Sequence, residues 1–561
     1  MERIWKIKNT DPQLQVKLSE ELNIHPVVAQ LLINRGIVNP KEAKFFLNAQ
    51  LSDFHDPFLF KDMRKAVLRI QQAKQNAEIV LVFGDYDVDG VTSSTLLTNL
   101  LKSMGIKVFN FIPHRMEHGY GLHIDVAAFA KQNGVTLLIS VDCGTTAFEE
   151  VKAINAQGIE VIVIDHHEPM EHRVPDAFAI INPKQKDCPY PFKELASVGL
   201  VVKLYQAFHG VLNEDILDLA AIGTIADIVP LRDENRIIVK AGLLAVGKTK
   251  NVGLKALLDV AKIKDKKISP YHVGFILGPR INAAGRMDSA HKSLDLFLSE
   301  DSEEAYNLAR ILEKHNTQRQ KTQNDIVQEA LGIVETEIDF ENEKVIVLSK
   351  EGWHKGVLGI VASRLTDKYY RPSIVISLKD GVGTASARSI DGFHLHEVLS
   401  NCADHLEEFG GHEGAAGLTI KAENIDPFRQ LINKIAHNTL ELQKLRPCVD
   451  IDCEIPLSLI SLKLANTIDS MEPFGEGNPH PTFCSRRLLV KTQAQVLGKD
   501  TLKFWVTDGK KSISAVGFGM GKLKDMVNAG AQVDLAYQIQ IDDWNKAPTP
   551  QLKIKDIKVS E

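Results

Sequence analysis

The feature that most constrains the fold is a short apolar run followed at once by three closely spaced aspartates. Ile79 to Phe83 are consecutive apolar residues, and Gly84-Asp85-Tyr86-Asp87-Val88-Asp89-Gly90 follows them. Such a run predicts a strand buried on both faces, as in a parallel sheet. Carboxylates at the carboxyl end of that strand lie where open α/β sheets bind ligands. Like charges this close favour a bound divalent cation over the alternative, a solvated Asp-rich turn.

The same order of apolar run and polar loop recurs downstream. Residues 137–141 precede Asp142-Cys143-Gly144, residues 159–164 precede Asp165-His166-His167-Glu168, and a helical stretch near 213–226 precedes Asp227. Strands alternating with helices predict an α/β fold with a doubly wound parallel sheet. Because the carboxyl ends of parallel strands share one edge, we expect five side chains to converge there: Asp87, Asp89, Asp142, His166 and Asp227.

The residue types at this edge indicate a metal. Carboxylates with one imidazole suit Mn²⁺ or Mg²⁺ better than a thiolate-preferring metal. Two ions about 3.5–4 Å apart form a clamp for phosphoryl hydrolysis, and one carboxylate must then bridge them. A single aspartate before a glycine, such as Asp142, is commonly only a turn former. Several such residues at successive element ends are harder to explain as turns.

Composition bounds the remaining possibilities. With 561 residues, 44% of them hydrophobic and 25% charged, the chain is a globular protein of three or more domains. The net charge of −6 argues against a broadly basic nucleic-acid coat, so a polyanion needs a local patch. The six cysteines form no CxxC pair, which suits free thiols in a reducing cytoplasm. No apolar run has the length of a membrane span, and residues 1–6 lack the core of a secretory signal; a cytoplasmic protein is expected.

Changes of pattern along the chain divide it into five parts. A stretch with helical apolar spacing has an almost wholly polar middle, residues 313–324, which is typical of a helix bridging two domains through solvent over about 50 Å. Short strands dominate after residue 448 and predict a small barrel of the OB type. The predicted parts are a helical entry segment 1–75, a catalytic α/β domain 76–300, a connecting helix 301–336, a second α/β domain 337–445 and an OB-like nucleic-acid-binding domain 446–561.

The polar motifs resemble those of the DHH phosphoesterase superfamily. They are Asp85 to Gly90, Asp142-Cys143-Gly144, Asp165-His166-His167 and Ala226 to Pro230, and the resemblance extends over essentially the whole chain to its bacterial 5′→3′ exonucleases specific for single-stranded DNA. It implies two Mn²⁺ or Mg²⁺ ions, one held by Asp87 and Asp142 and the other by Asp89, Asp142, His166 and Asp227. It also implies catalytic positions for His167, facing the scissile phosphate, and for Asp85 as a supporting residue.

One position departs from the superfamily pattern. Many members have a histidine four residues before the aspartate at position 87, whereas this chain has Phe83. The first ion then has fewer ligands, so we expect two ions at saturating metal but unequal affinities.

Two further segments suggest contacts to the substrate. Gly278 to Met287 places Arg280, Asn282 and Arg286 among small residues, which suits phosphate contacts, although arginines in a loop can equally be solvated. A glycine-rich stretch, residues 410–417, carries His412 and resembles the GGHxxAAG motif of the DHH-associated domain (DHHA1). The resemblance implies that Ser386 and Arg388, with Arg115 and Arg280 opposite, hold the 5′-terminal phosphate and thereby set the polarity of degradation.

Aromatic residues in the C-terminal part have two interpretations. Phe504, Trp505 and Trp544 lie near lysines such as Lys503, a pattern that allows stacking on bases. The alternative, which we favour for at least half of them, is that they are core residues.

The resemblance implies an exonuclease of DNA recombination and repair that releases 5′-mononucleotides. The expected partners are single-stranded DNA, a single-strand-binding protein and a helicase, without a membrane, and the expected state is a monomer. Two alternatives remain: a phosphodiesterase for oligoribonucleotides or cyclic dinucleotides, and a non-catalytic scaffold of a replicative helicase. The long bridging helix and the barrel favour long substrates over the first, and the intact set of metal ligands speaks against the second.

Overall fold

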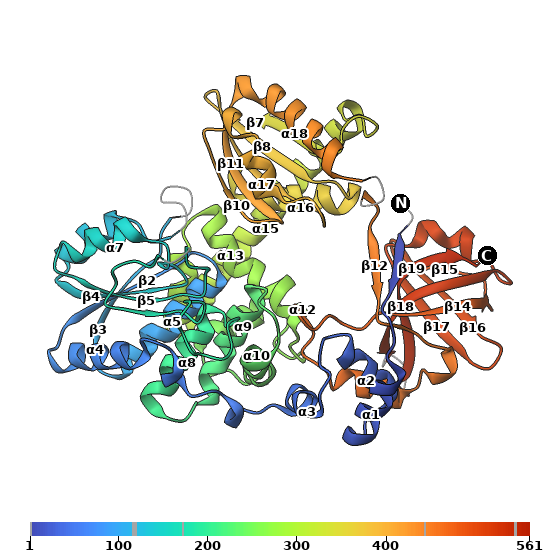
Figure 1. The fold of residues 1–561 in the computed structure, drawn as a ribbon, viewed down its shortest axis with the longest axis horizontal. Coiled ribbons are helices and arrows are strands. Elements are labelled where there is room, and N and C mark those ends of the chain that lie inside the picture. Colours follow the sequence, from blue (N-terminus) through green and yellow to red (C-terminus); the bar gives the residue numbers. More distant parts are fainter. Residues whose placement is uncertain (1–2, 115–120, 171–172, 442–444, 543–546, 561) are drawn as a thin grey trace.

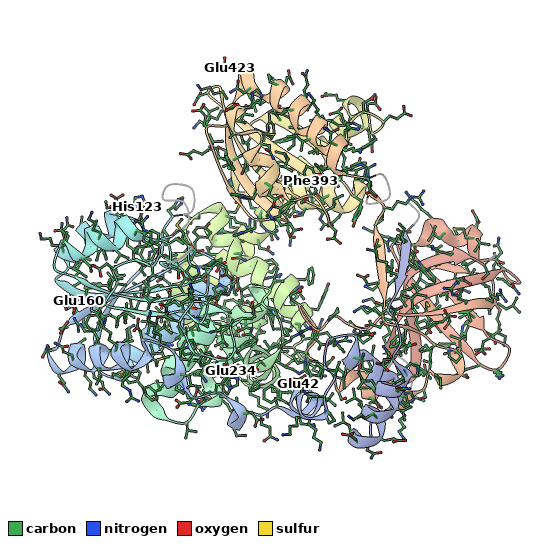
Figure 2. The ribbon with its side chains drawn as sticks, in the orientation of Figure 1. Glu42, His123, Glu160, Glu234, Phe393 and Glu423 are labelled. Atoms are coloured by element: carbon green, nitrogen blue, oxygen red, sulfur yellow. The ribbon has the colours of Figure 1, made fainter. Side chains whose placement is uncertain are left out.

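The computed structural model describes residues 3–114, 121–170, 173–441, 445–542 and 547–560. Three lobes are arranged in a ring (Figure 1). The first is at the left, the second at the top and the C-terminal lobe at the right. Each lobe has its own core: Phe393, for example, is buried in the second lobe and Glu234 in the first (Figure 2). Among the described residues, none of the helices combines the length and apolar character that crossing a bilayer requires.

The first lobe contains the predicted parallel sheet. Its strand order is β3-β2-β4-β5-β6, with all neighbours parallel. The strands are β2 (Ile79–Gly84), β3 (Lys107–Phe111), β4 (Val135–Val141), β5 (Glu160–Ile164) and β6 (Ala179–Ile181), the last of which the sequence pattern did not reveal. Helices α4 (Met63–Gln75), α5 (Val88–Ser103) and α8 (Ser197–His209) cover one face, and α6 (Asp125–Gln132) and α7 (Phe148–Asn155) cover the other. The doubly wound α/β fold is therefore confirmed.

A helical layer completes this lobe beside the sheet. It contains α9 (Leu217–Ala226), α10 (Asp233–Val246), α11 (Val252–Val260), α13 (Gly278–Met287) and α14 (His291–Leu298). The short helix α12 (Pro270–His272) continues through a π-helical turn, Val273–Leu277, into α13. Single π-helical turns of this kind are frequent at functional sites.

The N-terminal segment packs mainly against the opposite end of the chain. Strand β1 (Ile4–Ile7) pairs in parallel with β12 (Cys448–Ile451). Helices α1 (Pro12–Leu22), α2 (Pro26–Ile33) and α3 (Pro40–Asn48) follow. Leu31 and Phe46 share a core with Leu457 and Tyr537 of the C-terminal lobe, whereas α4 belongs to the first lobe. The segment predicted as 1–75 is thus divided between two lobes, because its apolar side chains find two different cores.

The connecting helix α15 (Ser302–Glu337) confirms the predicted long helix. The expectation that its polar middle bridges through solvent is wrong for one face. Asn316, Arg319 and Gln323 are buried, and the guanidinium of Arg319 donates to the side chains of both of the others. Polar residues can line a buried helix face when they hydrogen-bond one another, which a hydrophobicity pattern does not reveal.

The second lobe is a mixed five-stranded sheet with order β10-β11-β9-β8-β7. Its strands are β7 (Ile346–Glu351), β8 (Ser373–Lys379), β9 (Val382–Arg388), β10 (Glu408–Gly411) and β11 (Ala415–Lys421), and its helices are α16 (Leu358–Tyr369), α17 (Leu395–Ser400) and α18 (Ile425–Thr439).

The C-terminal lobe is a closed barrel. Strands β14 (Phe483–Val490), β18 (Gln532–Asp542), β19 (Thr549–Val559), β17 (Ser512–Phe518) and β16 (Thr501–Thr507) are neighbours in that order, and β14 also pairs with β16. Strands β13 (Cys453–Glu454) and β15 (Gln495–Leu497) extend the two ends, and α19 (Leu462–Asp469) precedes the barrel strands. The pairing of first and last strands removes the sheet edges and confirms an OB-like barrel.

Candidate metal centre

Three aspartates lie where strand β2 turns into helix α5. Asp87 caps the helix, and its Oδ1 accepts a hydrogen bond from Gly90 N at 3.1 Å. Asp89 stands in the first turn and is buried; its carboxylate accepts from Ser197 N at 2.7 Å and Val198 N at 2.9 Å. A Cβ at Gly90 would lie 2.4 Å from the carbonyl oxygen of Asp85, so only glycine allows this tight turn.

The remaining candidate ligands come from three other element ends. Asp142 follows β4 with a left-handed φ of 63°, His166 follows β5 by two residues, and Asp227 caps the carboxyl end of α9. Ligand atoms within 4.8 Å of one another form two neighbouring groups without a shared residue: Asp85, Asp87 and Asp142; and Asp89, His166 and Asp227. A third group, Asp142, His166 and His167, joins them. The structure therefore brings together every predicted metal ligand, and it adds Asp85 to the first group.

The electrostatics of these groups favour a bound cation. Burial, followed by the charge of Asp87, raises the pKa of Asp89 to about 7, and burial with the charges of Asp89 and Asp87 raises that of Asp227 to about 9. Burial and the surrounding carboxylates also raise the pKa of Asp142 well above its usual value. The protein alone thus places more negative charge here than it neutralises.

The imidazole of His166 is also suited to bind a metal ion. Its Nε2 is buried and has no hydrogen-bond partner among the described residues. This atom lies 3.4 Å from Asp227 Oδ2 and 3.5 Å from Asp142 Oδ1. Burial, with the neighbouring charge of His167, lowers the pKa of His166 to about 3, so its ring is neutral and able to coordinate. Carboxylate oxygens with one neutral imidazole fit Mn²⁺ or Mg²⁺.

The second histidine of the triplet has a different environment. His167 Nδ1 lies 2.7 Å from Asp165 Oδ1. Although burial opposes it, this hydrogen bond and the charge of Asp165 raise the pKa of His167 to about 9. Asp165 belongs to none of the ligand groups just described; it orients His167 and accepts from Thr145 N. The predicted role of His167 toward a phosphate stays a prediction.

Phe83, which stands where many superfamily members have a histidine, is a core residue. Its ring is buried and stacks on Phe111 with the ring centroids 5.5 Å apart. It offers no ligand, so the first group consists of carboxylates only.

The second lobe reaches the metal centre through the glycine-rich motif. A pocket of about 420 Å³ is lined by His166, His167 and Lys184 of the first lobe and by His412 of the second. The sequence predicted His412 but not Lys184, which follows β6 and lacks a motif around it. The pocket places a lysine and three imidazoles around one space.

A larger pocket of about 850 Å³ brings together several of the predicted substrate-binding residues. Ser386, Arg388 and Arg286 line it, with Lys355 as an additional cation. Arg286 Nη1 donates to Gly356 O at 3.0 Å, which links α13 to the second lobe. A Cβ at Gly359 would lie 2.9 Å from Arg388 Nη2, so glycine leaves room for the guanidinium. Basic side chains from two lobes converge here, as an anion site requires.

Two other predicted substrate residues are placed differently. Arg280 is held in an ion pair, with Nε 2.5 Å from Glu313 Oε2 of α15, and it does not line the pocket of Ser386 and Arg388. The spacing of arginines in the sequence could not reveal this helix–helix partner. Arg115 lies outside the described residues.

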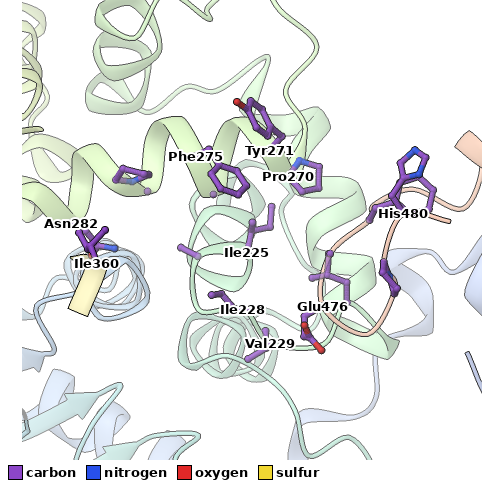
Figure 3. Close-up of a pocket in the computed structure, with 18 of the residues that line it drawn as sticks. Ile225, Ile228, Val229, Pro270, Tyr271, Phe275, Asn282, Ile360, Glu476 and His480 are labelled. Carbon is purple, nitrogen blue, oxygen red and sulfur yellow. The ribbon is translucent and has the colours of Figure 1, made fainter. Parts of the chain in front are cut away.

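Asn282 borders a third pocket, of about 630 Å³, which is mainly apolar (Figure 3). The end of α9 with Ile228, the segment α12 to α13 with the stacked rings of Tyr271 and Phe275, and the loop carrying Glu476 surround it. The exposed fractions of the Tyr271 and Phe275 side chains, 62% and 71%, leave both rings accessible.

The aromatic residues of the barrel divide between the two interpretations. Phe504 is buried in the core, Trp505 is exposed on β16, and Trp544 lies outside the described residues.

Comparisons with known proteins agree with this arrangement. Family models match residues 79–224 (DHH family, N-terminal domain), 342–438 (DHHA1 domain) and 451–556 (RecJ OB domain). The single-stranded-DNA-specific exonuclease RecJ of Bacillus subtilis is 40% identical over 99% of this chain and 71% of its own length. That of Haemophilus influenzae is 33% identical over 97% and 98%.

A solved structure gives the same result for the fold. The crystal structure of RecJ in complex with Mn²⁺ from Thermus thermophilus has a TM-score of 0.84 and 27% identity, covering 100% of this chain and 80% of that one. The Mg²⁺ complex from the same organism has a TM-score of 0.77. From its sequence, fold and candidate metal centre, the chain belongs to the RecJ family of DHH proteins.

Proposed function

We propose that this protein is a metal-dependent exonuclease that degrades single-stranded DNA from its 5′ end and releases 5′-mononucleotides. The observation that carries the proposal is the pair of adjoining ligand groups at the sheet edge of a RecJ-family chain. RecJ proteins of several bacteria are named as single-stranded-DNA-specific exonucleases, and the matched structures contain Mn²⁺ or Mg²⁺.

The proposed cofactor is a pair of Mn²⁺ or Mg²⁺ ions. Asp85, Asp87 and Asp142 would hold one ion, and Asp89, His166 and Asp227 the other, with Asp142 between them. Divalent cations supply Lewis acidity, which lowers the pKa of water and offsets the charge of a phosphodiester. His167, positioned by Asp165, would face the scissile phosphate from the pocket it shares with Lys184 and His412.

The proposed polarity rests on the basic pocket of the second lobe. Ser386 and Arg388 of the second lobe, with Arg286 of the first, would hold a 5′-terminal phosphate by charge-assisted hydrogen bonds. A strand anchored there would present a bond near its 5′ end to the metal centre.

Replacing Arg388 by alanine should weaken the preference for a 5′ phosphate by about tenfold or more, since a hydrogen bond to a charged group contributes about 1.5–3 kcal/mol. The measurement compares degradation of 5′-phosphorylated and 5′-hydroxyl strands of one sequence with Mn²⁺ present. Lys379→Ala, outside this pocket, is the control. An undiminished preference in Arg388→Ala would remove the anchoring role.

The same assay separates the alternative substrates. Single-stranded DNA of several tens of nucleotides should be degraded faster than dinucleotides or cyclic dinucleotides. The opposite preference would favour a short-substrate phosphodiesterase, and no hydrolysis of either would favour a scaffold.

The proposed function also includes a cellular location, an oligomeric state and protein partners. It would act in the cytoplasm as a monomer, on strands opened by a helicase and covered by a single-strand-binding protein. Light scattering tests the monomer, and degradation of strands precoated with such a protein tests the partner.

A further inference from the structure

A six-residue loop of the C-terminal lobe, Phe474 to Pro479, lies against the chain that follows Asp227. Leu231 N donates to Glu476 O at 2.8 Å, and Arg232 Nε donates to Gly477 O at 3.2 Å. In Figure 3 the loop carrying Glu476 runs beside the segment with Ile228 and Val229. The contact lies four residues from a candidate metal ligand, although the loop belongs to another lobe.

The loop is closed on itself by a buried asparagine. Gly475 and Asn478 exchange backbone hydrogen bonds of 2.9 and 3.1 Å. The Asn478 side chain is fully buried and donates to Met471 O at 2.9 Å and Pro473 O at 2.8 Å. These bonds give the loop a single shape before it meets the first lobe.

Two buried arginines hold the loop and the chain that leads into it. Arg35, at the end of α2, donates to Asn478 Oδ1 and to Pro479 O, both at 2.6 Å. Arg236, in the first turns of α10, donates to Met471 O and Glu472 O at 2.9 Å and to Phe46 O at 2.6 Å. A buried cation is costly unless its donors are used, so these contacts tie three parts of the chain together.

The segment after Asp227 needs such support. Ile228 has a left-handed φ of 62°, which is unfavourable for a β-branched residue, and its side chain is 69% exposed. A strained residue persists where its surroundings over-determine it. Leu231, by contrast, is buried against Gly475, where an added Cβ would lie 2.6 Å from Leu231 Cδ1.

We infer that Gly475 and its loop are positioning elements for Asp227, through which the C-terminal lobe completes the metal group of Asp89, His166 and Asp227. The inference rests on the proposed function, because it requires that this group bind a metal ion. Gly475 belongs to none of the ligand groups; it acts by allowing Leu231, and with it the chain back to Asp227, to lie in place.

The test measures Mn²⁺ binding to the full-length protein by calorimetry in two backgrounds. Asp87→Ala leaves the group of Asp227, and Asp227→Ala leaves the group of Asp87. Gly475→Ala should weaken Mn²⁺ binding about tenfold in the Asp87→Ala background, as loss of outer support does at other metal sites, and should not change it in the Asp227→Ala background.

Three further variants define the cause. Adding Leu231→Ala to Gly475→Ala removes the clashing atoms and should restore most of the affinity. Arg232→Ala, at an exposed residue, removes one bond to the loop and should give a smaller loss in the same background. Gly332→Ala on α15, where an added Cβ meets nothing within 4 Å, should change neither background.

Unchanged Mn²⁺ affinity in Gly475→Ala, or an equal loss in both backgrounds, would overturn the inference while leaving the metal centre intact. If Asp87→Ala and Asp227→Ala did not each remove one ion, the proposed metal centre itself would be wrong, and the inference with it.

Discussion

Two clusters of acids and histidine in the first lobe have similar ligand spacing but balance their negative charge differently. One is the metal centre, and the other consists of His55, Asp233 and Glu234, whose ligand atoms also lie within 4.8 Å of one another. In the second cluster Lys203 Nζ lies 2.8 Å from Glu234 Oε1, and the hydroxyl of Tyr190 donates to Glu234 Oε2 at 2.5 Å. Spacing alone therefore does not identify a metal site.

The difference lies in where the positive charge comes from. Lys203 is fully buried and also donates to His55 O, so the chain itself supplies the cation of the second cluster. At the metal centre, burial and mutual repulsion instead raise the pKa of Asp89, Asp142 and Asp227. Carboxylates that repel one another inside the protein are a better candidate for a bound ion than a carboxylate held by a buried lysine.

The largest expected effect concerns Lys203. Lys203→Met should lower the free energy of unfolding by about 3–5 kcal/mol, because it leaves the buried Glu234 without its cation. Chemical denaturation measures this loss, and the double variant Lys203→Met/Glu234→Gln should recover part of it. The affinity of the folded protein for Mn²⁺ should not change. If Lys203→Met bound fewer Mn²⁺ ions, the cluster of Glu234 would be coupled to the metal centre.

Replacing Asp142 should affect turnover rather than folding. Asp142→Ala removes a ligand from between the two groups, so the rate of single-strand degradation should fall by more than about a hundredfold, the upper range for loss of mere outer-shell support. Asp233→Asn, in the comparison cluster, is the matched control and should retain activity. Near-normal nuclease activity in Asp142→Ala would refute the proposal that Asp142 and its neighbours at the sheet edge form the metal centre.

The third prediction concerns the free energy of unfolding with and without bound metal. Mn²⁺ at ten times its dissociation constant should add about 1.4 kcal/mol to the free energy of unfolding, and a chelator should abolish the gain. With chelator present, Asp142→Asn should be at least as stable as the unmodified protein, because it relieves repulsion. Thermal unfolding measures both, and a strongly destabilised Asp142→Asn would indicate that this carboxylate stabilises the fold, as that of Glu234 does.

The sequence predicts well that the side chains of the candidate metal centre share one edge, because most of them lie at strand ends. A buried run such as Ile79–Phe83 has a definite direction in a parallel sheet, so the position of Asp87 and Asp89 follows from the topology alone. The same reasoning holds for Asp142 and His166. The long helix α15 and the barrel also follow from local patterns.

What the sequence did not reveal depends on contacts between distant segments. The pairing of β1 with β12, the ion pair of Arg280 with Glu313 and the approach of His412 to His167 each join residues of different elements. Lys184 reaches the same pocket without a motif of its own. The pattern of a single sequence shows the hydrophobic period of each helix or strand. It does not show which other element packs beside it.

The most direct test is a calorimetric titration of the metal-free protein with Mn²⁺. We predict two ions per chain with unequal affinities, since the first group has only carboxylates and Phe83 adds no ligand. Asp142→Ala should weaken both. Two identical tight sites would contradict the unequal pair, and binding that survives Asp142→Ala unchanged would contradict the metal centre itself.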